Sequence, residues 1–411
     1  MSNLGANLSV LRDHNTAVVL GLLRDAGEHG ASRAELAAAT GLTPQAVSKI
    51  TARLREEGLA ADAGRRASTG GKPAAALRLV AGAALAVGVQ VDRDAVTAVL
   101  VDLAGAVLAV RTAPVAFGAG AEVVLSAVAG EVRAVAEGAS FPDPAPSPFP
   151  EGLLPEGLRP PATPGPRSAW SPRMPHGLEG EPAGGGARLL GVGIAVPGPL
   201  DHRLGVLGKV TGFAQWDGFP LRDALRERLG LPVVLDKDTN AAALGLTRRT
   251  ARPGGSFAYL HLGTGLGAGL VLGGAVHRGA RTGAGEFGHQ VLQLDGPPCA
   301  CGRRGCLEVL CLRAVAAGDR AQAARLLGTG AANLVQLLDV DRVVLGGRTV
   351  LADPEVYLRG VRAEVPATVA VAVAPARERT VAEGAAESVL APLFGPATRP
   401  DDAIIAPMSG V

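Results

Sequence analysis

The stretch GEFGHQVLQLDGPPCACGRRGCLEVL, residues 285–310, holds three of the four cysteines in this chain of 411 residues. Its histidine and cysteines follow the spacing H-x9-C-x-C-x4-C, at His289, Cys299, Cys301 and Cys306. One imidazole and three thiolates form a donor set that suits tetrahedral Zn²⁺, and the intervening glycines let the chain curl round an ion. Four protein ligands leave no open coordination position, so the pattern predicts a structural zinc. Ordinary buried cysteines and a redox pair are the alternatives, and Cys311 lies outside the spacing as an expected core residue.

The composition of the chain sets its general class. Its length predicts two or three folded units, and its net charge of +2 excludes a polycation that coats nucleic acid. No apolar run is long enough to span a bilayer, and the opening residues lack the basic-then-apolar order of a signal peptide. We therefore expect a cytoplasmic protein, and in that reducing compartment the cysteine cluster suits a metal better than a disulfide framework.

The first eighty residues predict a winged helix-turn-helix. Ser32 and Glu35 have the spacing of a capping box, and Gly41 follows as the end of that helix. Thr43 can cap the next helix, with Pro44 at its first position. Residues 58–80 then read as a strand, a basic glycine-rich turn and a strand, which is the pattern of a wing. A protein-binding or capping module is the alternative, but the wing directly downstream favours DNA.

The expected roles of side chains in this unit follow from helical periodicity. The small core should contain Leu36, Leu42, Val47, Ile50 and Leu54. Candidate DNA contacts on the second helix, which would enter a major groove, are Thr43, Gln45, Ser48, Lys49 and Arg53. Candidate backbone or minor-groove contacts of the wing are Arg65, Arg66 and Lys72.

The rest of the chain, residues 81–411, predicts an α/β body in two lobes. Residues 84–114 read as a three-stranded meander, and a helix pattern follows at about 123–137. Residues of about 139–187 are dense in proline and glycine and predict a disordered insertion, with a proline-rich docking segment as the alternative. Strands and helices alternate after this insertion, which is typical of α/β architecture.

Five motifs together resemble the ROK family, named for its repressors, open reading frames and kinases. They are VGIAVPGPLD at 192–201, DKDTNAAALG at 236–245, LGTGLGAG at 262–269, GAGEFGH at 283–289 and CACGRRGCLE at 299–308. The resemblance implies an actin-like, hexokinase-like ATPase fold for the body. It also implies that members with an N-terminal winged helix-turn-helix are repressors that answer to sugars, whereas members without it are mostly ATP-dependent sugar kinases.

The first phosphate loop departs from the kinase pattern. ROK kinases place a turn of the form D-x-G-G-T after the first strand, whose glycines let backbone N–H groups approach phosphate oxygens. Asp92 is kept here, but residues 93–96 are Arg, Asp, Ala and Val. Their side chains would stand where phosphate should lie, and Asp94 would add repulsion. The glycine turn at 263–267 and Gly346-Gly347 match the other nucleotide-side turns, so we expect a degenerate ATP site.

The sequence matches the sugar-binding positions of the family better than it matches the first phosphate loop. Asp238 falls at the position of the kinase base, and it could also accept a hydrogen bond from a sugar hydroxyl without reaction. Lys237 replaces an asparagine and is expected to pair with Asp238, while Gly212 replaces a sugar-contacting asparagine. The sugar-contacting positions of the family correspond to Glu286, His289 and Glu308. Helix-capping around the metal is the alternative role for these acids.

We therefore expect a sugar-responsive DNA-binding transcriptional regulator. It is expected to act as a repressor and to have no enzymatic activity. Its partners would be a double-stranded operator and a sugar or sugar derivative, with structural Zn²⁺ pinning the sugar-contacting loop. A homodimer or homotetramer would carry the paired DNA-binding units that read a pseudo-palindrome. The alternatives are an ATP-dependent sugar kinase with a fused DNA-binding domain and a constitutive repressor without a ligand.

Overall fold

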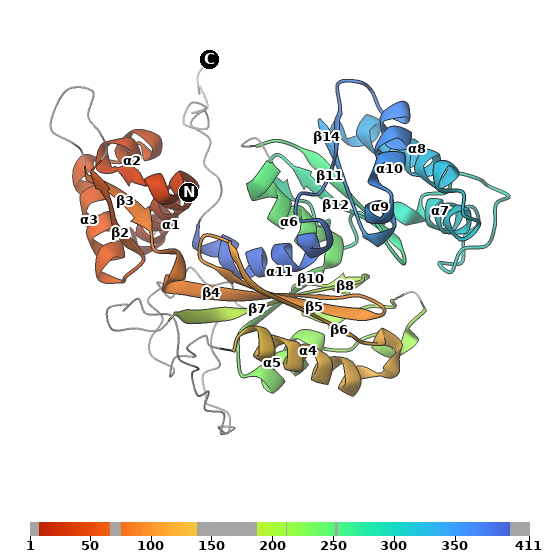
Figure 1. Ribbon diagram of the computed structural model, residues 1–411, viewed down its shortest axis with the longest axis horizontal. Helices are drawn as coiled ribbons and strands as arrows, with labels where there is room; N and C mark the ends of the chain where they lie inside the picture. The colour runs from red at the N-terminus through yellow and green to blue at the C-terminus, as the bar shows by residue number, and fades with distance from the viewer. Residues whose placement is uncertain (1–7, 66–74, 138–186, 211, 251–253, 395–411) are drawn as a thin grey trace, which may run out of the picture.

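The computed structural model describes residues 8–65, 75–137, 187–210, 212–250 and 254–394 (Figure 1). Two expected DNA contacts, Arg66 and Lys72, lie outside these residues, as does the proline-rich segment from 139 to 186. Ala187, the last residue assigned to that segment, is partly buried directly before a strand. No helix in the described ranges is both long and apolar enough to cross a membrane.

The N-terminal unit contains three helices against a small antiparallel sheet of order β1-β3-β2. The capping box is confirmed, because the Ser32 hydroxyl accepts a hydrogen bond from the Glu35 N–H at 3.2 Å and the Glu35 carboxylate accepts one from the Ser32 N–H at 2.7 Å. Gly41 is left-handed, with φ of 67°, and Thr43 caps the next helix through the Ala46 N–H. The elements are α1 (Leu8–Ala26), β1 (Ala31–Ser32), α2 (Arg33–Thr40), α3 (Pro44–Glu56), β2 (Ala60–Arg65) and β3 (Ala75–Leu79).

The predicted core residues of this unit lie as expected. Leu36, Val47 and Leu54 are buried, and Leu42 and Ile50 pack against them with part of their surface exposed. The same apolar cluster continues from α1 into the body, where it includes residues of the last long helix. The helix-turn-helix therefore rests on the body through apolar packing.

The first lobe is a five-stranded sheet of order β10-β7-β4-β5-β6. The meander β4-β5-β6 is antiparallel as predicted, and β7 and β10 add to it in parallel. Helices α4 and α5 cover one face of the sheet and α11 covers the other (Figure 1). The elements are β4 (Ala84–Val91), β5 (Ala95–Asp102), β6 (Val107–Pro114), α4 (Ala121–Val135), β7 (Arg188–Val196), α5 (Leu221–Leu229), β10 (Val233–Lys237) and α11 (Thr380–Leu390). A short hairpin, β8 (Leu200–Asp201) and β9 (Val206–Leu207), follows β7.

The second lobe is a five-stranded sheet of order β13-β12-β11-β14-β15. The sequence patterns did not identify β13 and β15, which are short, nor the brief helix α9. The elements are α6 (Asp238–Thr250), β11 (Phe257–Leu262), β12 (Leu266–Leu272), β13 (Ala275–Val276), α7 (Leu307–Ala316), α8 (Arg320–Leu338), β14 (Arg342–Gly346), α9 (Arg348–Ala352), α10 (Pro354–Glu364) and β15 (Ala370–Val373).

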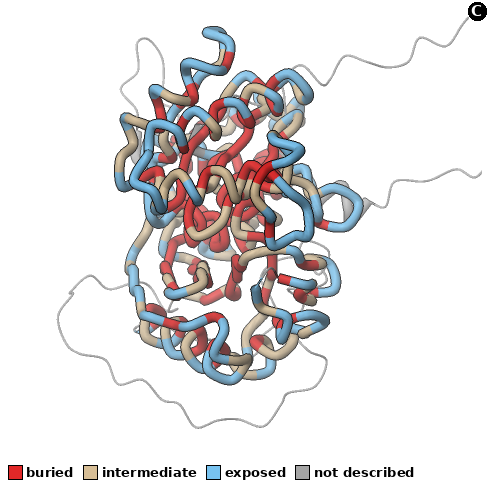
Figure 2. The backbone as a smooth tube through the Cα atoms, turned by 90° about the vertical axis from the view of Figure 1, so that its right-hand side faces the viewer, coloured by how far each residue is buried: buried red, intermediate tan, exposed pale blue. Residues whose placement is uncertain are grey.

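Helices α6 and α11 lie between the two sheets and join the lobes (Figure 1). They cross at Gly245 and Gly384, where a Cβ added to Gly384 would lie 1.9 Å from the carbonyl oxygen of Ala241. Backbone contact this close requires glycine. Figure 2 shows that buried stretches occupy the interior of the molecule and that exposed stretches form the outer helices and loops.

A buried ion pair fastens α1 to the body. Arg24 donates to both carboxylate oxygens of Glu387 on α11, at 2.9 and 2.7 Å, and the two side chains are only 4% and 8% exposed. Arg24 also donates to the carbonyl of Ala104 at 3.1 Å. Arg248 near the end of α6 donates to Asp25 on α1 at 2.7 Å and lies 3.6 Å from Glu387. Three helices therefore meet at one charged junction.

Candidate functional site

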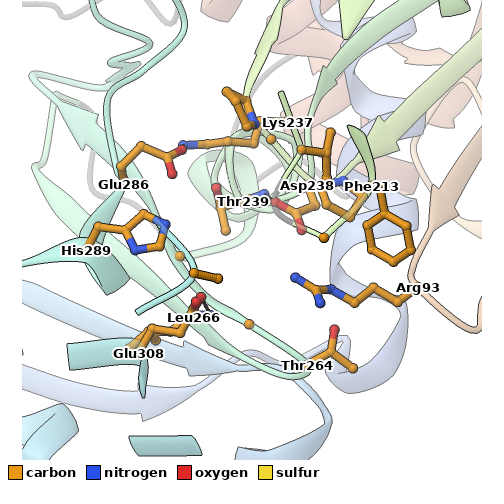
Figure 3. Close-up of a pocket in the computed structure, with 18 of the residues that line it drawn as sticks. Arg93, Phe213, Lys237, Asp238, Thr239, Thr264, Leu266, Glu286, His289 and Glu308 are labelled. Carbon is orange, nitrogen blue, oxygen red and sulfur yellow. Dashed lines mark hydrogen bonds and ion pairs between the residues drawn. The ribbon is translucent and has the colours of Figure 1, made fainter. Parts of the chain in front are cut away.

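A cavity of about 580 Å³ opens between the two lobes (Figure 3). Its walls come from the β4–β5 turn, the segments after β7 and β9, the start of α6, the β11–β12 turn and the loop before α7. All four side chains that sequence reasoning assigned to a ligand line it, namely Asp238, Glu286, His289 and Glu308. The fold thus brings together residues that are far apart in the sequence.

Asp238 is the first residue of α6, directly after strand β10. Its carboxylate accepts a hydrogen bond from the Thr239 N–H at 2.6 Å. Burial raises the pKa of Asp238 above its ordinary value, and the nearby His261 and Lys237 offset only part of that rise. Asp238 is therefore suited to accept or share a proton with a hydroxyl group.

The expected ion pair between Lys237 and Asp238 is wrong. The Lys237 ammonium group instead donates to the carbonyl of Ala284 at 2.6 Å and to the Glu286 carboxylate at 3.2 Å. Lys237 is the last residue of β10 and reaches the 284–286 loop, whereas Asp238 is the first residue of α6, where its carboxylate accepts from the Thr239 N–H. Lys237 is buried and holds Glu286 at the cavity wall.

Glu308 lies in the first turn of α7, which begins directly after the last cysteine of the cluster. Its carboxylate accepts a hydrogen bond from the Leu266 N–H at 2.8 Å. This contact ties α7 to the glycine turn between β11 and β12. A Cβ added to Gly265 of that turn would lie 3.1 Å from the same carboxylate, so the turn and the acid are in close contact.

The histidine and three cysteines of the opening stretch converge on one point. One ligand atom from each residue can be chosen so that all four lie within 4.8 Å of one another. The Nδ1 atom of His289 is 3.7 Å from the Cys299 sulfur, and the sulfurs of Cys301 and Cys306 are 3.7 Å apart. The edge of a tetrahedron of thiolates around Zn²⁺ is about 3.8 Å, from Zn–S bonds of about 2.3 Å. The cluster therefore fits one tetrahedral metal ion.

The loop that carries the cysteines is folded by its backbone. The N–H of Cys299 donates to Arg303 and the N–H of Gly302 donates to Cys299, at 2.8 and 3.0 Å. Gly305 has φ of 62°, and a Cβ there would lie 1.6 Å from the carbonyl oxygen of Gln293, so no larger residue fits. Cys311 lies outside the cluster as predicted. It is buried in α7, and burial raises the pKa of its thiol to about 12.

An ion pair crosses between the lobes on the side expected for nucleotide. Arg348, directly after the Gly346-Gly347 turn, donates to both oxygens of Asp94 at 2.6 and 3.0 Å and lies 3.7 Å from Asp92. The hydrogen bond to Arg348 holds the pKa of Asp94 below its ordinary value. Asp94 is expected from the sequence to add repulsion against phosphate, and its ion pair with Arg348 offsets part of that negative charge. Sequence reasoning did not identify Arg348.

The expected DNA contacts within the described residues lie on or directly before α3 and at the end of β2. Thr43, Gln45, Ser48 and Lys49 are exposed on or before α3, and Arg53 is partly exposed with an ion pair of 2.7 Å to Glu57. Arg65 is the last residue of β2. Sequence reasoning missed the exposed Arg55 on the same helix, which pairs with Asp62. Helical periodicity could have identified it, because it lies on the solvent side.

Residues 181–318 match the ROK family. A glucokinase of Halalkalibacterium halodurans is 40% identical over 124 residues, which are 30% of this chain and 37% of that protein. The xylose repressor of Bacillus subtilis is 26% identical over 279 residues, which are 68% of this chain and 61% of the repressor. The chain thus spans less than two thirds of the length of these curated relatives.

Solved structures agree on the fold. A ROK family transcriptional regulator described as a homologue of the E. coli MLC protein superimposes with a TM-score of 0.66 and 18% identity, over 93% of this chain and 98% of that one. The ROK hexokinase of Thermus thermophilus superimposes with a TM-score of 0.51 and 28% identity, over 74% and 96%. Residues 181–318 therefore match the ROK family, and the chain has the two-lobed hexokinase-like fold of these structures, preceded by a winged helix-turn-helix.

Proposed function

We propose that the chain is a DNA-binding transcriptional regulator that answers to a sugar, acts as a repressor and transfers no phosphate. One observation carries the proposal. The cavity keeps the carboxylates that match sugar binding, whereas the Asp94–Arg348 ion pair joins turns that match nucleotide binding. The ion pair joins the β4–β5 turn to the Gly346-Gly347 turn, between which nucleotide phosphates would have to enter.

The retained carboxylates suit sugar hydroxyls. Each oxygen of Glu286, Glu308 and Asp238 can accept a hydrogen bond, and adjacent carboxylates can take neighbouring hydroxyls of one ring. His289 can present one ring nitrogen to the cavity while its Nδ1 faces the cysteine cluster. Zn²⁺ in that cluster would hold the orientation of this ring and the start of α7, a structural role away from any reaction.

DNA binding is assigned to α3 and the wing. Lys49 and Arg53 would contact bases or phosphates of a double-stranded operator, and Gln45 and Ser48 would face base edges. Two such units in a homodimer or homotetramer would read two half-sites about one helical turn apart. A regulator of this kind would act in the cytoplasm, together with its operator.

The charged junction of three helices supports communication between ligand and DNA. Helix α6 begins at Asp238 in the cavity, and Arg248 near its other end donates to Asp25 on α1. Helix α11 packs on α6 and carries Glu387, the partner of Arg24. A ligand that shifts α6 would therefore act on α1 through ion pairs, as a change in population between two arrangements.

A sugar kinase with a fused DNA-binding unit is the second candidate. The relatives named glucokinase favour it, as does Asp238, which lies where a base would take a proton from a sugar hydroxyl. The two candidates predict different results in one assay, in which the purified chain is mixed with MgATP and a panel of aldoses and sugar phosphate is measured. Turnover that disappears in Asp238→Asn would establish the kinase and refute the regulator without catalysis.

DNA binding is tested in parallel. DNA fragments retained by the chain from a random library would be sequenced, and the effect of each sugar on their retention would be measured. We expect an enriched pseudo-palindrome, released by one class of sugar, and no sugar phosphate formed. The absence of any enriched sequence would contradict the assignment of α3.

A further inference from the structure

We propose that the sugar recognised by this cavity is anionic, bearing a phosphate or a carboxylate, and that Arg93 binds that anion. The inference rests on the proposed function and specifies the ligand class of the same site. It makes Arg93 a residue that determines ligand specificity.

Arg93 enters the cavity from the turn between β4 and β5, at the variable second position of the D-x-G-G-T pattern. Figure 3 shows its guanidinium group pointing into the cavity from the same wall as Phe213. The guanidinium carbon lies 5.4 Å from the centre of the Phe213 ring, a cation–π contact that fixes the approach of the side chain. A Cβ added to Gly265 would lie 4.0 Å from an Arg93 nitrogen, so the cation also reaches the glycine turn.

The acids that line the cavity already have partners. Asp92 accepts hydrogen bonds from the Arg93 N–H at 2.7 Å and from the Thr264 hydroxyl at 3.3 Å, and it lies 3.7 Å from Arg348. Glu286 is paired with Lys237, and Glu308 accepts from the Leu266 N–H. Asp238 accepts a hydrogen bond from the Thr239 N–H at 2.6 Å, and burial raises its pKa above the ordinary value.

Two cations that line the cavity, Arg93 and Lys209, have no carboxylate partner among the described residues. Within the described ranges, no carboxylate lies within 4.0 Å of the guanidinium of Arg93, and none lies that close to the ammonium of Lys209 at the rim. The two acids of the β4–β5 turn are close to Arg348, which pairs with Asp94 at 2.6 Å and lies 3.7 Å from Asp92. A planar guanidinium group without a carboxylate partner is suited to bind phosphate or carboxylate through two hydrogen bonds.

The same cavity thus offers two kinds of contact side by side. Glu308 and Arg93 both lie next to Gly265, so a ligand that gives hydroxyls to the carboxylates can place an anion on Arg93. A neutral sugar would use the first contact and leave the second unused. A charge-assisted hydrogen bond contributes about 1.5–3 kcal/mol, which corresponds to about a tenfold to 150-fold gain in affinity.

The experiment compares matched ligands by isothermal titration calorimetry on the full chain. The probes are aldoses, the 6-phosphates of the same sugars and the corresponding uronic acids, together with inorganic phosphate and MgATP. The variants are Arg93→Gln, which removes the cation, and Arg93→Lys, which keeps the charge but loses the two-pronged geometry. Arg359→Gln is the control, because Arg359 is exposed on α10 and does not line the cavity.

We expect at least one phosphorylated or carboxylated sugar to bind at least tenfold more tightly than its parent. Arg93→Gln should raise the Kd of that ligand at least tenfold and leave the Kd of the parent within about twofold, with Arg93→Lys between them. Equal affinities of parent and anionic sugars for the wild type would overturn the inference and leave the sugar-responsive regulator standing. If MgATP binds to the wild type and this binding is lost in Arg93→Gln, the anion held by Arg93 is the nucleotide. That result would overturn the inference in favour of the kinase. Binding of no sugar at all would refute the proposed function as well.

Discussion

Replacing Arg24 with methionine should lower the free energy that holds helix α1 on the body by about 3 kcal/mol. The Arg24 and Glu387 side chains are 4% and 8% exposed, and breaking a pair this buried by removing one partner costs about 3–5 kcal/mol. The lower end applies to Arg24→Met, because Arg248 remains 3.6 Å from the Glu387 carboxylate and compensates part of its charge. Methionine also keeps much of the side-chain volume over the Phe394 ring, which Arg24 now covers at 4.3 Å.

Glu387→Gln should cost more, near the upper end of that range at about 5 kcal/mol. It leaves Arg24 and Arg248 facing each other without their shared carboxylate. The double variant should be less destabilised than the sum of the two, because the side chains act as one unit. Arg111→Met is the control, since the Arg111–Glu131 pair is half exposed on its arginine side and such pairs contribute at most about 1 kcal/mol.

Hydrogen–deuterium exchange of the α1 amides, read by mass spectrometry under conditions where refolding outpaces exchange, measures the effect locally. A loss of 3 kcal/mol corresponds to roughly 100-fold faster exchange. Wild-type exchange rates in both single variants would refute the reasoning, as would a smaller effect of Glu387→Gln than of Arg24→Met. The first result would mean that α1 is held by its apolar face alone, and the second would mean that Arg248 does not depend on Glu387 for its charge partner.

Three further outcomes test other parts of the molecule. Cys301→Ser should lose the bound metal and destabilise the second lobe, whereas Cys311→Ala should keep one zinc per chain by elemental analysis; a metal-free wild type would contradict the zinc assignment. Lys49→Ala should weaken binding to the selected DNA and lower the slope of its salt dependence by about 1, with Arg359→Ala unchanged. The Asp94–Arg348 pair should make the wild type more stable than Arg348→Ala at pH values above the ordinary pKa of Asp near 3.8, because the pKa of Asp94 is lowered in the folded protein. This difference in stability should disappear as the pH falls through the lowered pKa. A difference that persists in acid would show that it has another origin.

Local patterns in the sequence predicted much of the N-terminal unit. Capping residues, a left-handed glycine and helical periodicity act within a few residues of each other, so Ser32, Gly41 and Thr43 could be assigned in advance. The metal ligands also lie close in sequence, and a spacing of cysteines and histidine indicates a site directly. The four expected cavity residues came from resemblance to a family, and the fold brings them to one cavity.

The contacts that sequence reasoning missed join distant residues. Arg348 and Asp94 are 254 positions apart, and Arg24 and Glu387 are 363 apart, so no local pattern links them. Their pairing depends on how the two lobes and α1 are placed in space. The wrong partner for Lys237 has the same origin, because Glu286 reaches it only through the folded loop. Charge partners across lobes therefore required the structure.

The crossing of α6 and α11 at Gly245 and Gly384 constrains how the molecule can change shape. Backbone touches backbone there, so the two helices cannot approach further, and separating them would open a gap that no side chain fills. The easiest movement that preserves this contact is a swivel about the crossing point. The two lobes would then rotate relative to each other about this point, and the width of the cleft and the angle of α1 would change together.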